Sequence, residues 1–133
     1  MDLLPNLRNY LKKTKNDWNY ITPQEFYEMD KKKNKKKDYL LIDIRRADDF
    51  KKGHIAGAKN IYWCDILDDK NLKKLPKNKK IFLICYVGHT SSQVMVLLKL
   101  LGYDVTSIKF GMGISPMMGV PVAGWVDYGY PVV

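Results

Sequence analysis

Two short apolar runs set the strongest limit on how this chain of 133 residues can fold. Residues 39–44 read Tyr-Leu-Leu-Ile-Asp-Ile, and residues 81–85 read Ile-Phe-Leu-Ile-Cys. Neither run alternates between apolar and polar residues, so each is typical of a strand covered on both faces in a parallel sheet. Helical patterns alternate with such runs along the chain, which predicts an α/β fold.

The segments around these runs carry the signals of helices and shorter strands. Thr22-Pro23-Gln24-Glu25 combines a capping hydroxyl, a proline at the first helical position and a glutamate at the third, which predicts a helix that ends near Asp30. Ser91-Ser92-Gln93 opens an apolar stretch over residues 94–101 that predicts a helix packed on the sheet and ended by Gly102. We also expect a short amphipathic helix over residues 3–13, a helical turn over 48–52, a strand over 58–62, a helix over 65–75, a strand over 105–108, and a final helix or turn anchored by Trp125.

Length and composition fit one globular domain. Hydrophobic residues make up 46% of the chain, and no internal repeat is present. We expect residues 1–20 to form an N-terminal helical extension and residues 21–133 to form a single domain. No apolar span has the length of a membrane helix, and the N-terminus lacks the apolar core of a signal peptide. These features predict a cytoplasmic protein without membrane insertion; the alternative is an extracytoplasmic protein whose export signal has been removed.

The formal net charge of +9 comes almost wholly from lysine. A lysine excess suits anionic small substrates or acidic partner proteins, and it also aids solubility. Because no basic stripe is interleaved with aromatic residues, we expect no nucleic acid partner. The run Lys-Lys-Lys-Asn-Lys-Lys-Lys at residues 31–37 is interpreted as a solvated connection, with a polyanion or membrane-surface site as the alternative.

Cys85 ends the second apolar run, directly before a short loop and a helix. Loop N–H groups and the positive end of a helix dipole favour negative charge at this place, so the sulfur is positioned to be a thiolate. The thiolate is the nucleophilic form of cysteine, and we interpret Cys85 as a nucleophile rather than a buried structural residue. Gly88 is expected to adopt a positive φ that turns loop N–H groups toward a ligand. His89 either contacts an anion or shapes the loop.

Other residues with reactive side chains favour structural roles. Asp43 and Arg45 are interpreted as a buried polar network rather than an acid–base pair. His54 is expected to bond to the backbone. Cys64 is expected to be buried, with a second persulfide or resolving thiol as the alternative.

We expect no metal and no cofactor. Neither of the two cysteines has a metal-ligand spacing with a histidine. Three methionines are predicted to pack, together with Trp125, around the rim of the site rather than to bind copper, and these are Met112, Met117 and Met118.

Two motifs, in this order and spacing, resemble the signatures of the rhodanese family. Leu-Ile-Asp-Ile-Arg at residues 41–45, Asp49-Phe50, and Gly-His-Ile-Ala-Gly-Ala-Lys-Asn-Ile at residues 53–61 resemble its N-terminal signature. Cys-Tyr-Val-Gly-His-Thr at residues 85–90, followed by Ser91, resembles the active-site loop of a bacterial subset with Cys-Tyr-x-Gly-His/Gln-Thr. Leu101-Gly102-Tyr103 and two C-terminal pieces, Gly124-Trp125 and Gly-Tyr-Pro-Val at 129–132, resemble later family features. The resemblance covers roughly residues 21–133.

The resemblance implies a rhodanese-like α/β fold, with a central parallel sheet of about five strands flanked by helices on both faces. It implies a sulfurtransferase in which Cys85 takes the outer sulfur of thiosulfate or a persulfide donor and passes it to cyanide or a thiol. The implied partners are these small molecules and, as a further option, a persulfide-donating protein. The implied substrate-binding residues are those of the loop after the cysteine, namely Tyr86, Val87, Gly88, His89, Thr90 and Ser91.

The chain departs from the family in one respect that bears on the substrate. Many rhodaneses carry arginine two residues after the loop glycine, where this chain has Thr90. A donor anion would depend instead on backbone N–H groups, on hydroxyls and on His89. Related phosphatases and arsenate reductases need arginine six residues after the cysteine, where this chain has Ser91, so that chemistry is disfavoured. The open alternatives are a non-catalytic rhodanese-like module that binds a partner or senses redox state, and a persulfide relay between proteins.

Overall fold

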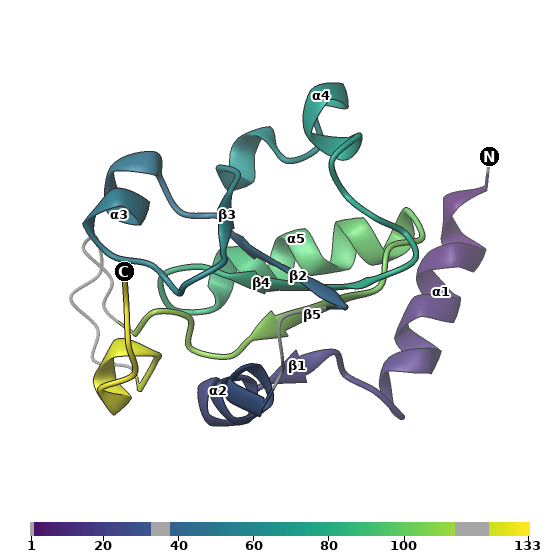
Figure 1. Cartoon of the computed structure of the whole chain (residues 1–133). Helices are drawn as coiled ribbons and strands as arrows, with labels where there is room; N and C mark the ends of the chain where they lie inside the picture. The colour runs from purple at the N-terminus through teal and green to yellow at the C-terminus, as the bar shows by residue number, and fades with distance from the viewer. Residues whose placement is uncertain (1, 33–37, 114–122) are drawn as a thin grey trace.

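A parallel sheet forms the centre of the fold (Figure 1). The structure, a computed structural model, describes residues 2–32, 38–113 and 123–133. Within these ranges five strands pair in the order β1-β5-β4-β2-β3, and every pairing is parallel. The predicted parallel sheet of about five strands is therefore confirmed. The strands are β1 (Tyr20–Ile21), β2 (Tyr39–Asp43), β3 (Lys59–Asn60), β4 (Lys80–Ile84) and β5 (Val105–Ile108).

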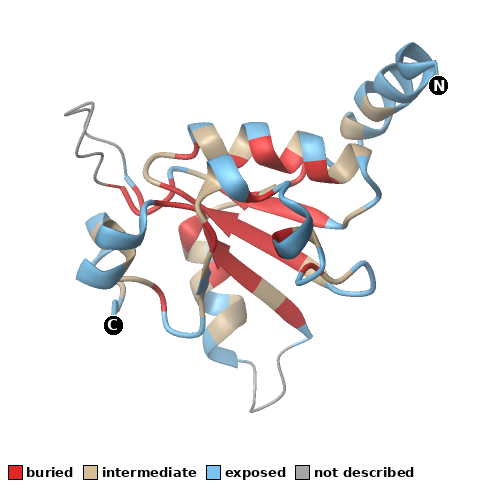
Figure 2. Cartoon of the chain, turned by 90° about the horizontal axis from the view of Figure 1, so that it is seen from above, coloured by how far each residue is buried: buried red, intermediate tan, exposed pale blue. Residues whose placement is uncertain are grey.

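Helices cover both faces of this sheet, as expected. One face is covered by α5 together with η1 and the residues around α4, and the other face is covered by α2 and the C-terminal segment that contains η2 (Figures 1 and 2). The described helices are α1 (Leu3–Thr14), α2 (Pro23–Lys32), α3 (Ala47–Lys52), α4 (Asp69–Leu72) and α5 (His89–Leu100), with the 3₁₀ helices η1 (Trp63–Asp65) and η2 (Val126–Tyr128).

Two hydrophobic clusters lie on opposite faces of β4. Ile81 and Leu83 belong to the cluster beneath α5, whereas Phe82 and Ile84 belong to the cluster around Phe26 of α2. Successive side chains of a strand point to opposite faces, so both sets of positions must be apolar when both faces are covered. This is why the run at residues 81–85 shows no alternation, and Figure 2 shows the strands as the most completely buried part of the chain.

The start of α2 follows the predicted capping pattern. The backbone N–H of Glu25 donates to Thr22 Oγ1 at 3.0 Å, and the backbone N–H of Thr22 donates to Glu25 Oε1 at 3.1 Å. These reciprocal bonds satisfy two N–H groups that the first helical turn leaves without backbone partners. In contrast, α5 begins at His89 and not at Ser91 as expected, because Gly88 in the left-handed conformation serves as its N-cap.

The single helix expected over residues 65–75 is wrong, since this segment contains the end of η1 and the short helix α4. Asp68 adopts an extended backbone, with φ −61° and ψ 143°, and so interrupts the helical path. The buried Asn71 side chain donates to the Asp65 carbonyl oxygen at 2.7 Å, which joins the two pieces. The strand expected over residues 58–62 is reduced to β3, because Ala58 takes part in a turn with its N–H bonded to Ile55.

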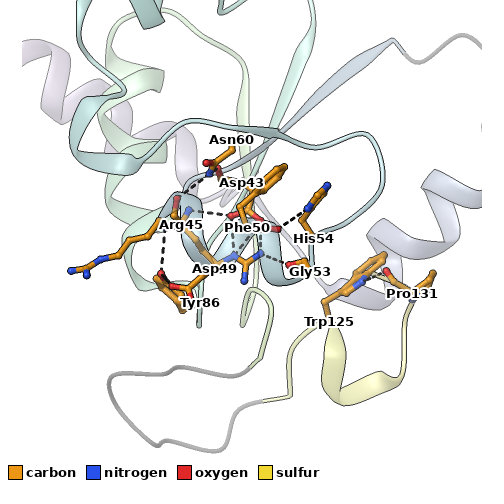
Figure 3. A network of polar contacts seen from close by, with 11 residues as sticks. Asp43, Arg45, Asp49, Phe50, Gly53, His54, Asn60, Tyr86, Trp125 and Pro131 are labelled. Carbon is orange, nitrogen blue, oxygen red and sulfur yellow. Dashed lines mark hydrogen bonds and ion pairs between the residues drawn. The ribbon is translucent and has the colours of Figure 1, made fainter. Parts of the chain in front are cut away.

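A buried ion pair follows the end of β2 (Figure 3). Arg45 Nη2 lies 2.8 Å from Asp43 Oδ2 and also donates to the Gly53 carbonyl oxygen at 2.8 Å. The Asn60 amide donates to the carbonyl oxygens of Asp43, at 2.9 Å, and Arg45, at 3.0 Å. The predicted polar network is therefore present, and it joins β2, β3 and the end of α3.

The C-terminal segment is held beside α3 by backbone and ring contacts of His54. The His54 ring stacks on Phe50 with centroids 3.6 Å apart, and Nδ1 lies 2.7 Å from the Phe50 carbonyl oxygen. The backbone of His54 exchanges two hydrogen bonds with Val133, of 3.0 and 2.8 Å. The structural role expected for His54 is confirmed.

After β5 the chain returns to the end of β4. The N–H of Met112 donates to the Cys85 carbonyl oxygen at 2.9 Å, and the N–H of Trp125 donates to the Gly111 carbonyl oxygen at 2.9 Å. Gly111 has φ +52°, and a Cβ atom there would lie 2.3 Å from the Cys85 carbonyl oxygen. A glycine is therefore required where this segment crosses the end of β4.

Of the helices in the described ranges, none has the length and apolarity needed to cross a bilayer.

Replacement of Gly111 by alanine tests this close approach. We expect Gly111→Ala to lower the free energy of unfolding by about 3 kcal/mol or more, since the new methyl group meets backbone that cannot move aside. Gly129→Ala is the matched control, because Gly129 has φ +71° but no atom within 4 Å of the added Cβ; its cost should be about 1–2 kcal/mol. Urea denaturation measures both values. An equal loss at the two positions would show that φ alone sets the cost.

Replacement of Arg45 by methionine tests the buried ion pair. The Asp43 side chain is fully buried, so loss of its partner leaves an uncompensated charge and should cost about 3–5 kcal/mol of unfolding free energy. Lys80→Met is the control, because Lys80 and Asp104 form a 2.8 Å pair whose side chains are 34% and 51% exposed, and its loss should cost about 1 kcal/mol or less. Similar urea midpoints for the two variants would contradict a stabilising role of the Asp43–Arg45 pair.

Candidate active site

The candidate site lies at the carboxyl end of β4, the central strand of the sheet. Cys85 follows directly after β4 and is 1% exposed. Three residues separate it from His89, the first residue of α5. In a parallel sheet the carboxyl ends of the strands line the region where ligands bind, so Cys85 lies where the sheet topology places such a site.

Backbone N–H groups at the start of α5 point at the Cys85 sulfur. The N–H of Gly88 lies 3.1 Å from Sγ and the N–H of Ser91 lies 3.4 Å from it. The first N–H groups of a helix have no partner within the helix, and the helix dipole adds partial positive charge there. The N–H donors that the sequence predicted around the sulfur are therefore present.

A serine hydroxyl completes the surroundings of the sulfur. Cys85 Sγ lies 3.3 Å from Ser91 Oγ, which in turn lies 2.7 Å from Ser107 Oγ of β5. Both serines are fully buried. Ser107 was not predicted as a site residue. Its sequence signal is weak, because Thr106 beside it in the strand at residues 105–108 also carries a hydroxyl. The register of β5 on β4 pairs Ser107 with Leu83, two residues before Cys85.

Gly88 adopts the conformation predicted for it. Its φ is +97°, and a Cβ atom at this residue would lie 3.0 Å from the backbone nitrogen of Phe110. The Gly88 carbonyl oxygen accepts a 2.6 Å hydrogen bond from Ser92 Oγ. A side chain at Gly88 would therefore strain the backbone and crowd the neighbouring segment, and its N–H could no longer point cleanly at the sulfur.

The Tyr86 side chain is directed toward α3 and the residue before it (Figure 3). Its hydroxyl donates to Asp49 Oδ2 and accepts a 3.4 Å hydrogen bond from the N–H of Arg46. Burial and the hydrogen bond to Asp49 raise the pKa of Tyr86 to about 12, so the hydroxyl stays protonated at neutral pH. The Arg45 guanidinium carbon lies 5.9 Å from the ring centroid. Tyr86 thus ties the loop to the polar network.

The other predicted loop side chains differ in exposure. His89 is exposed, whereas Val87 and Thr90 are half-buried. His89 and Thr90 are the first two residues of α5, where backbone N–H groups lack partners within the helix. The two interpretations of His89, anion contact or loop shape, stay predictions.

A pocket of about 380 Å³ lies beside Tyr86. Its lining combines the cationic side chains of Arg45 and Lys52 with the acidic side chain of Asp49 and the apolar side chains of Met112 and Val126. Met112 is buried in the cluster that contains Trp125, as expected. Met117 and Met118 lie outside the described residues.

Cys64 is exposed, so the prediction that it is buried is wrong. In a 3₁₀ helix, residues three apart share a direction. Trp63 and Ile66 turn toward the cluster beneath α5, and Cys64 between them faces solvent. Cys64 and Cys85 are both free thiols. Among the described residues, no three His, Cys, Asp or Glu side chains gather in a way that could hold a metal ion.

Comparisons with known proteins identify the family and the fold. The family model of the rhodanese-like domain matches residues 22–113. The uncharacterized protein YibN of Escherichia coli is 31% identical over 101 residues, which are 74% of this chain and 63% of YibN, so the match leaves over a third of that relative uncovered.

Solved structures show the same fold. A rhodanese-related protein from Thermoplasma volcanium superposes with a TM-score of 0.66 at 26% identity, covering 86% of this chain and 96% of that one. The thiosulfate sulfurtransferase of Pseudomonas aeruginosa superposes with a TM-score of 0.63 at 16% identity, covering 86% of this chain and 19% of that one, which shows similarity of fold alone. With a family model that covers most of its length and a cysteine at the carboxyl end of β4, this chain belongs to the rhodanese-like domain family.

Proposed function

We propose that this protein is a sulfurtransferase that carries a sulfane sulfur on Cys85. The observation that carries the proposal is the pair of backbone N–H groups, from Gly88 and Ser91, that donate to one sulfur atom from within 3.4 Å. A buried cysteine with a purely structural role needs no such donors. The fold shared with a thiosulfate sulfurtransferase is consistent with this activity.

In the first step the Cys85 thiolate attacks the outer sulfur of thiosulfate. A bond forms between Sγ and the outer sulfur, and the bond from that sulfur to the sulfonate group breaks. The electron pair of the broken bond leaves with sulfite, and Cys85 becomes a persulfide that carries the negative charge on its outer sulfur. The partial positive charge at the start of α5 lies next to this anion and stabilises it.

In the second step an acceptor removes the outer sulfur. Cyanide attacks it and leaves as thiocyanate, or a thiolate attacks it and leaves as a persulfide. The electron pair of the sulfur–sulfur bond returns to Sγ and restores the Cys85 thiolate. The N–H groups of Gly88 and Ser91 therefore donate to Sγ while it is an anion, before the first step and after the second.

Recognition of the donor differs from that in rhodaneses with an arginine in the loop. Here Thr90 occupies that position, so N–H groups at the start of α5 bind the anion. The anion reaches them through the pocket beside Tyr86, which the side chains of Arg45 and Lys52 help to line. The Arg45 charge is already paired with Asp43, which leaves Lys52 as the cation available to an incoming anion. A protein persulfide is a second candidate donor, because the net charge of +9 attracts acidic partners.

The reaction is tested by intact mass measurement after incubation with thiosulfate and then with cyanide. We expect the mass to increase by one sulfur atom and to return to its starting value, with release of thiocyanate. Cys85→Ser should abolish both changes, since a hydroxyl cannot form the persulfide. Cys64→Ser is the matched control and should take up and release one sulfur atom as the wild type does.

Loading on Cys64 in place of Cys85 would contradict the assignment. A chain that takes no sulfur from thiosulfate, polysulfide or a protein persulfide would instead fit the non-catalytic module. Loading from a protein persulfide but not from thiosulfate would support a relay.

Replacement of Ser91 by alanine tests the hydroxyl that contacts the sulfur. In the thiol form the Ser91 oxygen accepts from Cys85 and its hydroxyl donates to the Gly88 carbonyl oxygen, and in the thiolate form the hydroxyl is free to turn and donate to the sulfur. A hydrogen bond to a charged group contributes roughly 1.5–3 kcal/mol, so Ser91→Ala should slow persulfide formation by about tenfold to a hundredfold. Ser92→Ala is the control in the same turn, because its hydroxyl donates to the Gly88 carbonyl oxygen. Stopped-flow measurement of sulfite release gives both rates. An equal loss in Ser92→Ala would attribute the effect to the start of the helix rather than to the sulfur contact.

A further inference from the structure

The N-terminal helix α1 presents its apolar side to solvent. Its described residues include none that is buried. Leu3, Leu4, Leu7 and Leu11 are 54%, 55%, 37% and 68% exposed. In Figure 2 the helix extends beyond the body of the molecule. An amphipathic helix normally turns such a face toward the core, so the leucines of α1 are arranged for a contact outside the domain.

The polar side of α1 is the side that faces the domain. Asn6, Tyr10 and Thr14 line a pocket together with Lys99 and Leu100 at the end of α5. At 100° per residue, Leu4, Leu7 and Leu11 lie beside this polar side on the helix surface and not within it. We call the group formed by Leu3, Leu4, Leu7 and Leu11 the leucine face.

Positive charges border the leucine face on its other side. Arg8 and Lys12 each follow a leucine of this face by one position, and Lys15 follows Leu11 by four, which places these cations along one flank. Asp2, at the start of the helix, caps it by accepting a hydrogen bond from the N–H of Leu4. Apolar residues flanked by cations on one helix are typical of helices that lie in the interface of a membrane.

We propose that α1 docks on the surface of an anionic lipid bilayer, with the leucine face in the outer acyl region and Arg8, Lys12 and Lys15 at the lipid headgroups. Anionic headgroups match the flanking cations and the net charge of +9. A second copy of this chain matches them less well, because two leucine faces in contact would bring like charges together on molecules that already repel. The helix lies on the bilayer and does not cross it, in keeping with its 12 residues.

Such docking would hold Cys85 and its loop close to the membrane, while the sheet stays folded independently of the bilayer. The proposal does not depend on sulfur transfer by Cys85, since it concerns only α1.

Vesicle co-sedimentation of the whole chain tests this proposal. We expect binding to vesicles of equimolar phosphatidylcholine and phosphatidylglycerol, weakening as salt is added, and little binding to pure phosphatidylcholine. Leu4→Gln with Leu11→Gln should weaken binding about tenfold or more, since the two most exposed leucines no longer enter the acyl region. Leu67→Gln, at a leucine that is 42% exposed outside α1, is the matched control and should bind as the wild type does.

A second pair of variants tests the cations. Arg8→Gln with Lys12→Gln should weaken binding about tenfold or more, whereas Lys70→Gln with Lys73→Gln removes the same charge from exposed positions in and after α4 and should have a much smaller effect. Because α1 has no buried residue, the unfolding midpoints of its variants should stay close to that of the wild type.

Three results would overturn the proposal. The first is no binding to the anionic vesicles, and the second is equal binding to both kinds of vesicle. The third is a dimer in solution, seen by light scattering, that Leu4→Gln with Leu11→Gln dissociates; this would assign the leucine face to a second copy.

Discussion

The hydrogen bonds of Cys85 are the interaction on which the rest of this structure depends. Its carbonyl oxygen accepts from Met112, which fixes the segment after β5, and its sulfur accepts from the N–H groups of Gly88 and Ser91, which fixes the start of α5. One residue thus joins the end of the central strand to the helix that covers one face and to the chain that leads to Trp125 on the other. The same bonds that order the fold at this point place partial positive charge around the sulfur, so the site is a consequence of how β4 ends.

The polar network at the end of β2 explains how the neighbouring loop after β4 holds its shape. Asp43 and Arg45 are buried and paired, Asn60 bridges their carbonyl oxygens, and Tyr86 connects the loop to Asp49 through its hydroxyl. Buried polar groups of this kind have specific geometry, because each unpaired member would carry a desolvation cost. The loop after Cys85 is therefore supported on the α5 side by helix geometry and on the α3 side by side-chain hydrogen bonds.

Predictions from the sequence were most accurate at positions where the residue type suits a single structural role. A glycine between a buried strand and a helix predicted positive φ at Gly88, and a cysteine at the same junction predicted N–H groups around Cys85; both are found. Ser107 was missed, because a hydroxyl in an apolar strand has no local partner and gains one only when β5 lies beside β4. The exposure of Cys64 was also missed, since its apolar neighbours suggested burial and the 3₁₀ turn directs it outward. The edge strand β1 went unpredicted because two residues are too few to show a period.

Local sequence was enough to specify the buried strands, the capped start of α2 and the cysteine loop at the end of β4, because each depends on residues within a few positions of one another. Packing of distant segments decided which atoms meet at the sulfur and which face of α1 is left open. The Ser91–Ser107 contact needs β5 beside β4 and α5 packed against β5. The exposure of the leucine face needs the polar side of α1 to lie against the end of α5. Neither arrangement can be read from a helical or strand period, because a period gives the direction of a side chain on its own element and not the neighbour that it meets.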